Sequence, residues 1–160
     1  MEKQEFTIRL LGFVRSNKEG VYLELLDEYT IAIKGLNGFS YINVLWWCNL
    51  TDKEEYRNIL ECVKPYKGAP DKVGILTTRA PIRPNPIALS VMNVAKIENN
   101  RIYTDYIDAE DGTPIIDIKP YHPSSDRIRD VQVPEWCKHW PKWYEDSAGF
   151  DWEGEFVNAR

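Results

Sequence analysis

The sequence predicts a mostly β protein built from antiparallel strands, with one or two short helices. Short runs rich in branched and aromatic residues recur along the chain, for example Tyr-Ile-Asn-Val-Leu-Trp-Trp at 41–47, and such residues favour strands. Turn signals separate these runs: 17–20 reads Asn-Lys-Glu-Gly, and 98–101 carries paired asparagines that tolerate the positive φ of a tight hairpin. Residues 101–108 alternate between apolar and polar side chains, as a half-buried strand does.

Taken in order, these signals predict strands at 6–15, 21–26, 41–47, 74–78, 87–97, 101–108 and 115–118. We expect the 41–47 strand to be central, because it is apolar almost throughout. A short helix is predicted over 28–36, before Asn37-Gly38. A second is predicted over 51–63, where Thr51 and Glu54 form a capping-box pattern.

The composition is typical of a globular protein. The chain has 160 residues, 43% of them hydrophobic and 28% charged. No run is long enough to span a membrane, and the N-terminus lacks a signal-peptide pattern. Three cysteines, Cys48, Cys62 and Cys137, do not suggest a disulfide framework. We therefore expect a cytoplasmic protein.

The formal net charge of −5 argues against a large nucleic-acid surface, because phosphate contacts require a basic face. Residues 74–121 hold five Lys and Arg residues against six Asp and Glu residues. The charge therefore lowers the expectation of an RNA substrate.

Two segments between 74 and 121 carry the most unusual chemistry. Arg79 is followed by Arg83-Pro84-Asn85-Pro86, in which each proline fixes its φ and removes a donor. Such a segment presents side chains and does not join a sheet ladder. The second segment, 108–114, is a turn with three carboxylates, and functional groups collect in such loops.

The segments TTRAPIRPNPIALS (77–90) and DAEDGTPIIDIKPY (108–121) resemble the two signature blocks of the TsaA-like family, also called the TrmO family. Weaker similarity extends to 8–16 and 35–40, so that the resemblance covers residues 8–134. It implies an antiparallel β-barrel that uses S-adenosylmethionine as methyl donor. The best-known members of the family methylate threonylcarbamoyladenosine beside the tRNA anticodon.

The resemblance also implies the site residues. Arg79 suits the methionine carboxylate, because guanidinium pairs with carboxylates in a bidentate manner. The implied cofactor-binding residues are Arg79, Leu89, Asp108, Ala109, Glu110, Asp111, Gly112, Thr113 and Asn49. The implied catalytic or acceptor-binding residues are Arg83, Asn85, Lys119 and Tyr121. Two structural alternatives stay open: Asp111-Gly112 forms only a turn, or Arg83 pairs with Asp117 to hold strands.

The chain departs from the family pattern at several positions. After Ser16 it has a short turn where long members carry a Pro/Gly-containing loop, and Asn49 and Ala88 stand where histidine and glycine are common. We expect a short form without the C-terminal domain that long members use in tRNA handling. Two alternatives therefore accompany the tRNA methyltransferase: a small-molecule methyltransferase, and a non-catalytic module that binds S-adenosylmethionine or adenosine.

The last part of the chain is rich in aromatic residues. We expect a barrel domain at 1–134 and an aromatic extension at 135–160 that packs on the barrel; a lid or a base-stacking platform is the alternative. A helix is predicted to begin at Pro141. Cys137-x-His139 matches no common zinc pattern, so no metal site is expected. The aromatic surface suggests a homodimer.

Overall fold

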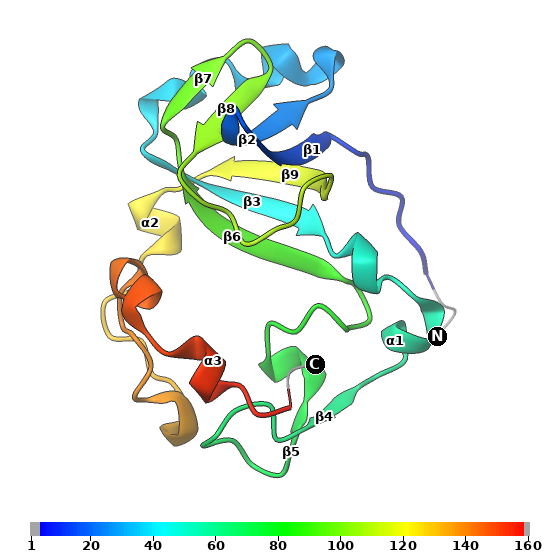
Figure 1. Ribbon diagram of the computed structural model, residues 1–160, viewed down its shortest axis with the longest axis vertical. Coiled ribbons are helices and arrows are strands. Elements are labelled where there is room, and N and C mark those ends of the chain that lie inside the picture. The colour runs from blue at the N-terminus through cyan, green and yellow to red at the C-terminus, as the bar shows by residue number, and fades with distance from the viewer. Residues whose placement is uncertain (1–3, 159–160) are drawn as a thin grey trace. The chain divides into compact units, whose positions relative to one another are not determined.

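The computed structural model describes residues 4–158 and divides the chain into two compact units (Figure 1). Unit 1 contains the described residues up to Asp52 together with Pro86–Arg127. Unit 2 contains Lys53–Asn85 together with the described residues from Ile128 onward.

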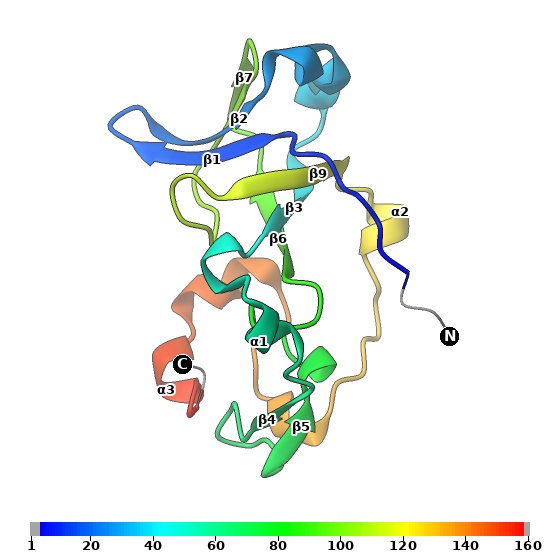
Figure 2. The same cartoon turned by 90° about the vertical axis from the view of Figure 1, so that its right-hand side faces the viewer.

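Unit 1 is built on one antiparallel sheet of seven strands (Figures 1 and 2). The order across the sheet is β6-β3-β9-β1-β2-β8-β7. The strands are β1 (Gly12–Asn17), β2 (Gly20–Leu25), β3 (Tyr41–Trp47), β6 (Ile87–Asn93), β7 (Lys96–Glu98), β8 (Arg101–Thr104) and β9 (Pro114–Pro120). β3 lies between β6 and β9, so the prediction of a central strand at 41–47 is confirmed.

The first and last strands of this order, β6 and β7, are separated in sequence only by Val94-Ala95. The chain bends there, so β6 pairs with β3 and β7 pairs with β8. Asn93 secures the bend: its Oδ1 accepts hydrogen bonds from Thr104 Oγ1 at 2.8 Å and from the Asp105 N–H at 3.0 Å. The mostly β, barrel-like prediction is confirmed. In the described structure the edge strands β6 and β7 do not pair with each other, and the bent segment between them links the two edges of the sheet.

The hydrophobic core of unit 1 lies on one face of the strands. Its buried side chains are Val14, Leu23, Leu25, Ile42, Val44, Met92, Ile102, Ile107 and Ile115. All of these residues except Ile107 lie on strands of the sheet, and β2 and β3 contribute alternate positions, as the pleat of a half-buried sheet requires. The predicted hairpin between β7 and β8 is confirmed, and Asn99 takes a φ of 54° in its turn.

Unit 1 also contains short helices. They are 3-10 helices at Asp27–Ile33, Leu36–Gly38 and Asn49–Thr51, and α2 at Pro123–Asp126. The first two cover most of the predicted 28–36 helix. α2 is fixed to the sheet because Asn43 Nδ2 donates to Asp126 Oδ1 at 3.0 Å.

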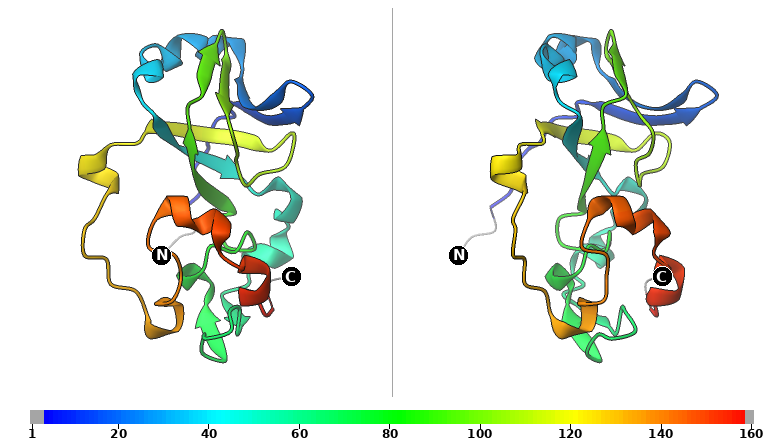
Figure 3. Two further views of the ribbon diagram at one scale, coloured as in Figure 1. Left: turned by 60° about the vertical axis from the view of Figure 1, so that its left-hand side comes forward. Right: turned by 90° about the vertical axis from the view of Figure 1, so that its left-hand side faces the viewer.

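Unit 2 contains little regular structure (Figure 3). α1 (Glu54–Arg57) precedes an antiparallel pair, β4 (Glu61–Val63) and β5 (Lys72–Gly74). The 3-10 helices Ile75–Thr77, Glu135–Cys137 and Tyr144–Gly149 follow, and α3 spans Trp152–Glu155.

An aromatic cluster forms the centre of unit 2. The buried Tyr66 ring stacks on Trp136 with centroids 5.4 Å apart and meets Trp140 edge-on at 4.8 Å. Gly68 lies so close to Trp136 that a Cβ there would fall 2.7 Å from the Trp136 carbonyl oxygen. The tryptophans thus contribute core packing within unit 2, while the packing of the 135–160 extension on the barrel stays a prediction.

Several element boundaries differ from those predicted. The predicted 51–63 helix is wrong beyond Arg57, because residues 61–63 pair with β5 and the Asn58 side chain donates to the Glu54 carbonyl as the helix ends. The Thr51 hydroxyl bonds the Cys48 carbonyl and does not cap a helix.

The predicted 74–78 strand is also wrong. β5 ends at Gly74, and the hydroxyls of Thr77 and Thr78 donate to carbonyls three residues back, which favours a 3-10 turn. The first strand begins at Gly12 and not at residue 6, and the strand predicted over 101–108 ends at Thr104. The helix predicted from Pro141 begins instead at Tyr144.

Candidate cofactor site at one end of the sheet

Three segments with predicted cofactor residues meet at the same end of the sheet in unit 1. The end of β3 pairs with the start of β6 through Trp47 and Ile87, and with the start of β9 through Trp46 and Ile115. Asn49 follows β3, Leu89 lies near the start of β6, and the 108–113 turn precedes β9. The antiparallel register therefore brings these segments to the same end of the sheet (Figure 1).

The 108–113 turn is held against β1 by main-chain hydrogen bonds. The Gly112 N–H donates to the Val14 carbonyl at 2.8 Å, and the Val14 N–H donates to the Thr113 carbonyl at 2.9 Å. Gly112 has a φ of +79°, a conformation that glycine adopts without steric cost. The turn is thus anchored on the sheet.

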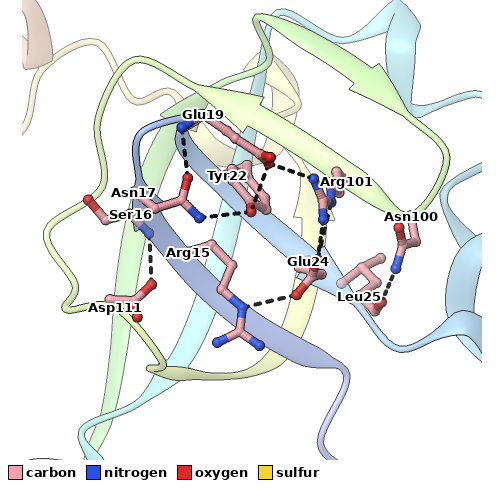
Figure 4. A network of polar contacts seen from close by, with 10 residues as sticks. All are labelled: Arg15, Ser16, Asn17, Glu19, Tyr22, Glu24, Leu25, Asn100, Arg101 and Asp111. Atoms are coloured by element: carbon pink, nitrogen blue, oxygen red, sulfur yellow. Dashed lines mark hydrogen bonds and ion pairs between the residues drawn. The ribbon is translucent and has the colours of Figure 1, made fainter.

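The side chains of the turn have different environments. Thr113 is only 3% exposed, whereas Asp108, Glu110 and Asp111 are exposed. Asp111 Oδ1 accepts a hydrogen bond from the Ser16 backbone N–H at 2.9 Å (Figure 4). The turn therefore exposes three carboxylates, and that of Asp111 is already bonded to the main chain of β1.

Leu89 and Asn49 add apolar and amide surface to this end of the sheet. Leu89 is 46% exposed and lies opposite Leu45 on β3, which in turn faces Asp117 on β9. Asn49 is exposed at the start of its 3-10 helix. Amide groups and apolar side chains of this kind can bind a nucleoside.

Lys119 and Tyr121 lie toward the opposite end of β9. Lys119 pairs in register with Asn43, and the Tyr121 N–H donates to the Tyr41 carbonyl. Lys119 lies four positions after Ile115 along the strand, which is about 13 Å. Lys119 Nζ also forms an ion pair with Asp117 Oδ2 at 2.6 Å. The structure therefore does not gather these two residues around the turn.

Arg79, Arg83 and Asn85 belong to unit 2. They follow the 3-10 helix Ile75–Thr77 in a segment without strand pairing in the described structure, as the prolines predicted. Arg79 and Asn85 are exposed. Arg83 is half-buried, and one of its guanidinium nitrogens lies 3.5 Å from the Thr78 carbonyl oxygen.

A charged network on the β1-β2 hairpin was missed by the sequence reasoning (Figure 4). Arg15 Nε donates to Glu24 at 3.0 Å, and Arg101 bonds Glu24 at 2.9 Å and Glu19 at 2.8 Å. The hydrogen bond from Arg15, followed by that from Arg101, outweighs burial and lowers the pKa of Glu24. Opposite charges across the predicted hairpin were the available signal.

Among residues 4–158, no group of three or more His, Cys, Asp or Glu side chains is arranged to hold a metal ion. None of the helices in that range is long and apolar enough to cross a membrane.

The family model for the tRNA-methyltransferase O N-terminal domain matches residues 13–127. The match includes both signature blocks and every predicted site residue. The chain belongs to this family. The predicted TrmO family membership is thereby confirmed.

Relatives of this TrmO-family chain agree with the predicted cofactor. A Pyrococcus horikoshii protein named "Probable S-adenosyl-L-methionine-binding protein" is 42% identical over 121 residues, which cover 74% of this chain and 85% of that protein. An S-adenosyl-L-methionine-binding protein of Archaeoglobus fulgidus is 34% identical over 110 residues, which cover 69% of this chain and 75% of that protein.

A solved structure confirms the fold of the TrmO-family chain. The crystal structure of TrmO from Pseudomonas aeruginosa matches with a TM-score of 0.65 and 26% identity over 84% of this chain. The match spans 62% of the TrmO chain.

Proposed function

We propose that this protein binds S-adenosylmethionine at the 108–113 turn and transfers its methyl group to a nucleophilic acceptor. The single observation that carries the proposal is that Asn49, Leu89 and the 108–113 turn meet at one end of the sheet, in a chain whose relatives are named for binding this molecule. The residues at that end fit the cofactor chemically: exposed carboxylates for hydroxyl or ammonium donors, the exposed Asn49 amide for a base edge, and an exposed leucine for apolar contact.

When bound, S-adenosylmethionine supplies an activated methyl group, so the protein needs mainly to bind, orient and exclude water. Exposed carboxylates of the turn accept hydrogen bonds from ribose hydroxyls or from the ammonium group. The exposed Asn49 amide offers a donor and an acceptor to the adenine edge, and Leu89 adds apolar contact. Arg79 is assigned to the carboxylate of the cofactor by its chemistry.

Arg83, Asn85, Lys119 and Tyr121 are assigned to the methyl acceptor. The first candidate acceptor is threonylcarbamoyladenosine in tRNA, in keeping with the family. The net charge of −5 favours a second candidate, a small molecule, because an acidic protein gains little from phosphate contacts. A module that binds the cofactor without catalysis is the third.

Two measurements test the proposal. Calorimetric titration of S-adenosylmethionine into the protein should give saturable binding, and Asp108→Asn together with Glu110→Gln should weaken it, whereas Glu28→Gln, an exposed carboxylate elsewhere in unit 1, should not. Mass spectrometry of tRNA nucleosides and small metabolites from cells with and without the gene then identifies the acceptor. No heat and no thermal shift at millimolar cofactor would refute cofactor binding, because a ligand specific for the folded state must stabilise it.

We further propose that the protein forms a homodimer. Large side chains near the C-terminus are exposed in the single chain, including Trp143, Tyr144, Phe156 and Val157, and apolar patches of this kind mark interaction surfaces. Sedimentation at micromolar concentration should give twice the monomer mass of 18.7 kDa. A single species of monomer mass would contradict the dimer.

A further inference from the structure

We propose that Asp111 is a positioning residue that fixes the turn to β1 and leaves the cofactor contacts to Asp108 and Glu110. This inference rests on the proposed cofactor binding and divides three carboxylates into two roles. It also explains why a carboxylate stands beside Gly112 at a tight turn.

The main contact is between residues 95 positions apart in sequence: the Ser16 backbone N–H donates to Asp111 Oδ1 at 2.9 Å. Two main-chain bonds join Val14 to Gly112 and Thr113 alongside it. β1 thus holds three consecutive residues of the turn, 111–113, through the alternate residues Val14 and Ser16. A hydrogen bond from an N–H to an ionised carboxylate is stronger than one between neutral groups.

The other two carboxylates differ. Asp108 and Glu110 are exposed, and within residues 4–158 their carboxylates form no hydrogen bond or ion pair. Only the main chain of Glu110 is engaged, since its carbonyl accepts from the Thr113 N–H at 3.1 Å. The two carboxylates that remain available to a ligand are therefore those on either side of Ala109.

The Ser16 N–H is itself held in place by the hairpin (Figure 4). Ser16 pairs with Val21 and Asn17 with Gly20 at its closed end. Asn17 Oδ1 accepts from the Glu19 N–H at 2.8 Å, and Asn17 Nδ2 donates to the Tyr22 hydroxyl at 3.1 Å.

Arg101 ties this closed end to β8, because its guanidinium bonds Glu19 at 2.8 Å and Glu24 at 2.9 Å. The N–H group that donates to Asp111 thus belongs to a hairpin whose strands are joined to each other and to β8 by side-chain bonds. The short turn after Ser16 therefore places the Ser16 N–H in a fixed position beside the 108–113 turn.

Asparagine and alanine at position 111 separate the two roles. Asparagine keeps the Oδ1 acceptor for the Ser16 N–H and loses the charge, whereas alanine loses both. If Asp111 acts by position, Asp111→Asn should bind S-adenosylmethionine within about threefold of the parent, and Asp111→Ala should bind about tenfold or more weakly. Asp108→Asn or Glu110→Gln should weaken binding by at least about tenfold.

A second readout is independent of the cofactor. In amide proton NMR spectra of the full chain, the Ser16 resonance should move upfield and exchange faster in Asp111→Ala, and should stay near its parent position in Asp111→Asn. The remaining spectrum shows whether each variant is folded. If Asp111→Ala does not fold, Asp111→Asn carries the comparison with the parent by itself.

The inference is overturned if Asp111→Asn weakens cofactor binding as much as Asp108→Asn and Glu110→Gln do, or if the Ser16 amide does not respond to Asp111→Ala. If the parent protein binds no S-adenosylmethionine, the proposed function fails, and the Ser16 amide still decides whether Asp111 anchors the turn.

Discussion

The Nε2 atom of His139 lies 3.0 Å from Oε2 of Glu155. The indole N–H of Trp140 donates to the other oxygen of the same carboxylate at 3.1 Å. Glu155 is only 5% exposed and ends α3, and its carbonyl accepts from the Lys67 N–H. The buried carboxylate thus joins α3 to the tryptophan-rich segment, and the main-chain carbonyl of the same residue joins α3 to the loop around Tyr66.

Replacing Glu155 should weaken unit 2. Glutamine removes the charge and puts an amide N–H₂ in place of one carboxylate oxygen, so that Trp140 and His139 no longer both face a carboxylate oxygen. We expect Glu155→Gln to lower the free energy of unfolding by about 1–3 kcal/mol, measured by urea titration with tryptophan fluorescence. Glu153→Gln, an exposed carboxylate on the same helix, is the matched control. Equal stability of the two variants would show that the buried carboxylate contributes nothing.

The same carboxylate should make unit 2 sensitive to acid. Burial alone would raise the pKa of Glu155, but hydrogen bonds from His139 and Trp140 outweigh it and lower the pKa. A group with a lowered folded-state pKa stabilises the fold above its unfolded pKa, about 4.3 for Glu, and this contribution is lost as pH falls through the folded value.

The stability difference between the parent and Glu155→Gln should therefore be full at pH 5.5 and shrink as pH falls toward 3. Glu24, whose pKa is also lowered, is present in both proteins and cancels in the difference. A difference that stays constant or grows over this range would contradict the assignment.

The bend at Asn93 should matter for unit 1. Asn93→Ala removes the acceptor for Thr104 and the Asp105 N–H, and the donor to Asp105 Oδ2 at 2.7 Å. We expect a loss of about 1–3 kcal/mol in unfolding free energy. Asn37→Ala, at an exposed position in a 3-10 helix, should cost much less. Similar denaturation midpoints for both variants would mean that the β6–β7 bend holds without the side chain.

The sequence predicted the parts of the fold that depend on local signals. The 41–47 strand is correct because its residues favour strands and its neighbours on both sides are antiparallel. The 98–101 turn is correct because Asn99 tolerates a positive φ. β4 was missed because its partner β5 lies beyond a loop, and nothing local in 61–63 distinguishes a strand from the end of a helix.

For the candidate site too, the sequence predicted the local segments but not the contacts between them. The motif blocks identified the 108–113 turn, but the bond between Ser16 and Asp111 joins residues 95 positions apart and depends on the register of β1. The separation of Lys119 from the turn likewise follows from the direction of β9. Such relations arise from strand pairing, which no single segment encodes.

Arg79 and Arg83 should differ in their effects on catalysis. Arg79 is assigned to the cofactor carboxylate, a contact that is the same before and during transfer. Arg79→Ala should therefore raise the KM for S-adenosylmethionine and leave kcat comparatively unchanged, as for any uniformly binding group. A fall in kcat at saturating cofactor with an unchanged KM would reassign Arg79 to the transition state.

Arg83 is assigned to the acceptor by its position in the family motif; its contact to the Thr78 carbonyl is long, at 3.5 Å, and its side chain is half-buried. Arg83→Ala should lower kcat while cofactor affinity, measured by calorimetry, stays near that of the parent. Removing a charged contact to the acceptor should cost about 2–5 kcal/mol in kcat/KM if the pair is buried, and much less if it is solvated. Arg83→Lys keeps the charge but not the planar guanidinium group. If Arg83 binds the acceptor in a bidentate manner, the activity of Arg83→Lys should lie between that of Arg83→Ala and that of the parent.

The alternative for Arg83 is a structural role through the Thr78 carbonyl, and thermal denaturation separates the two. A catalytic Arg83 predicts that Arg83→Ala melts within about 2 °C of the parent, because one long hydrogen bond contributes little to stability. If the variant instead melts well below the parent yet retains full activity when folded, Arg83 is structural, and the acceptor must be bound by other residues than the Arg83-Pro84-Asn85-Pro86 segment.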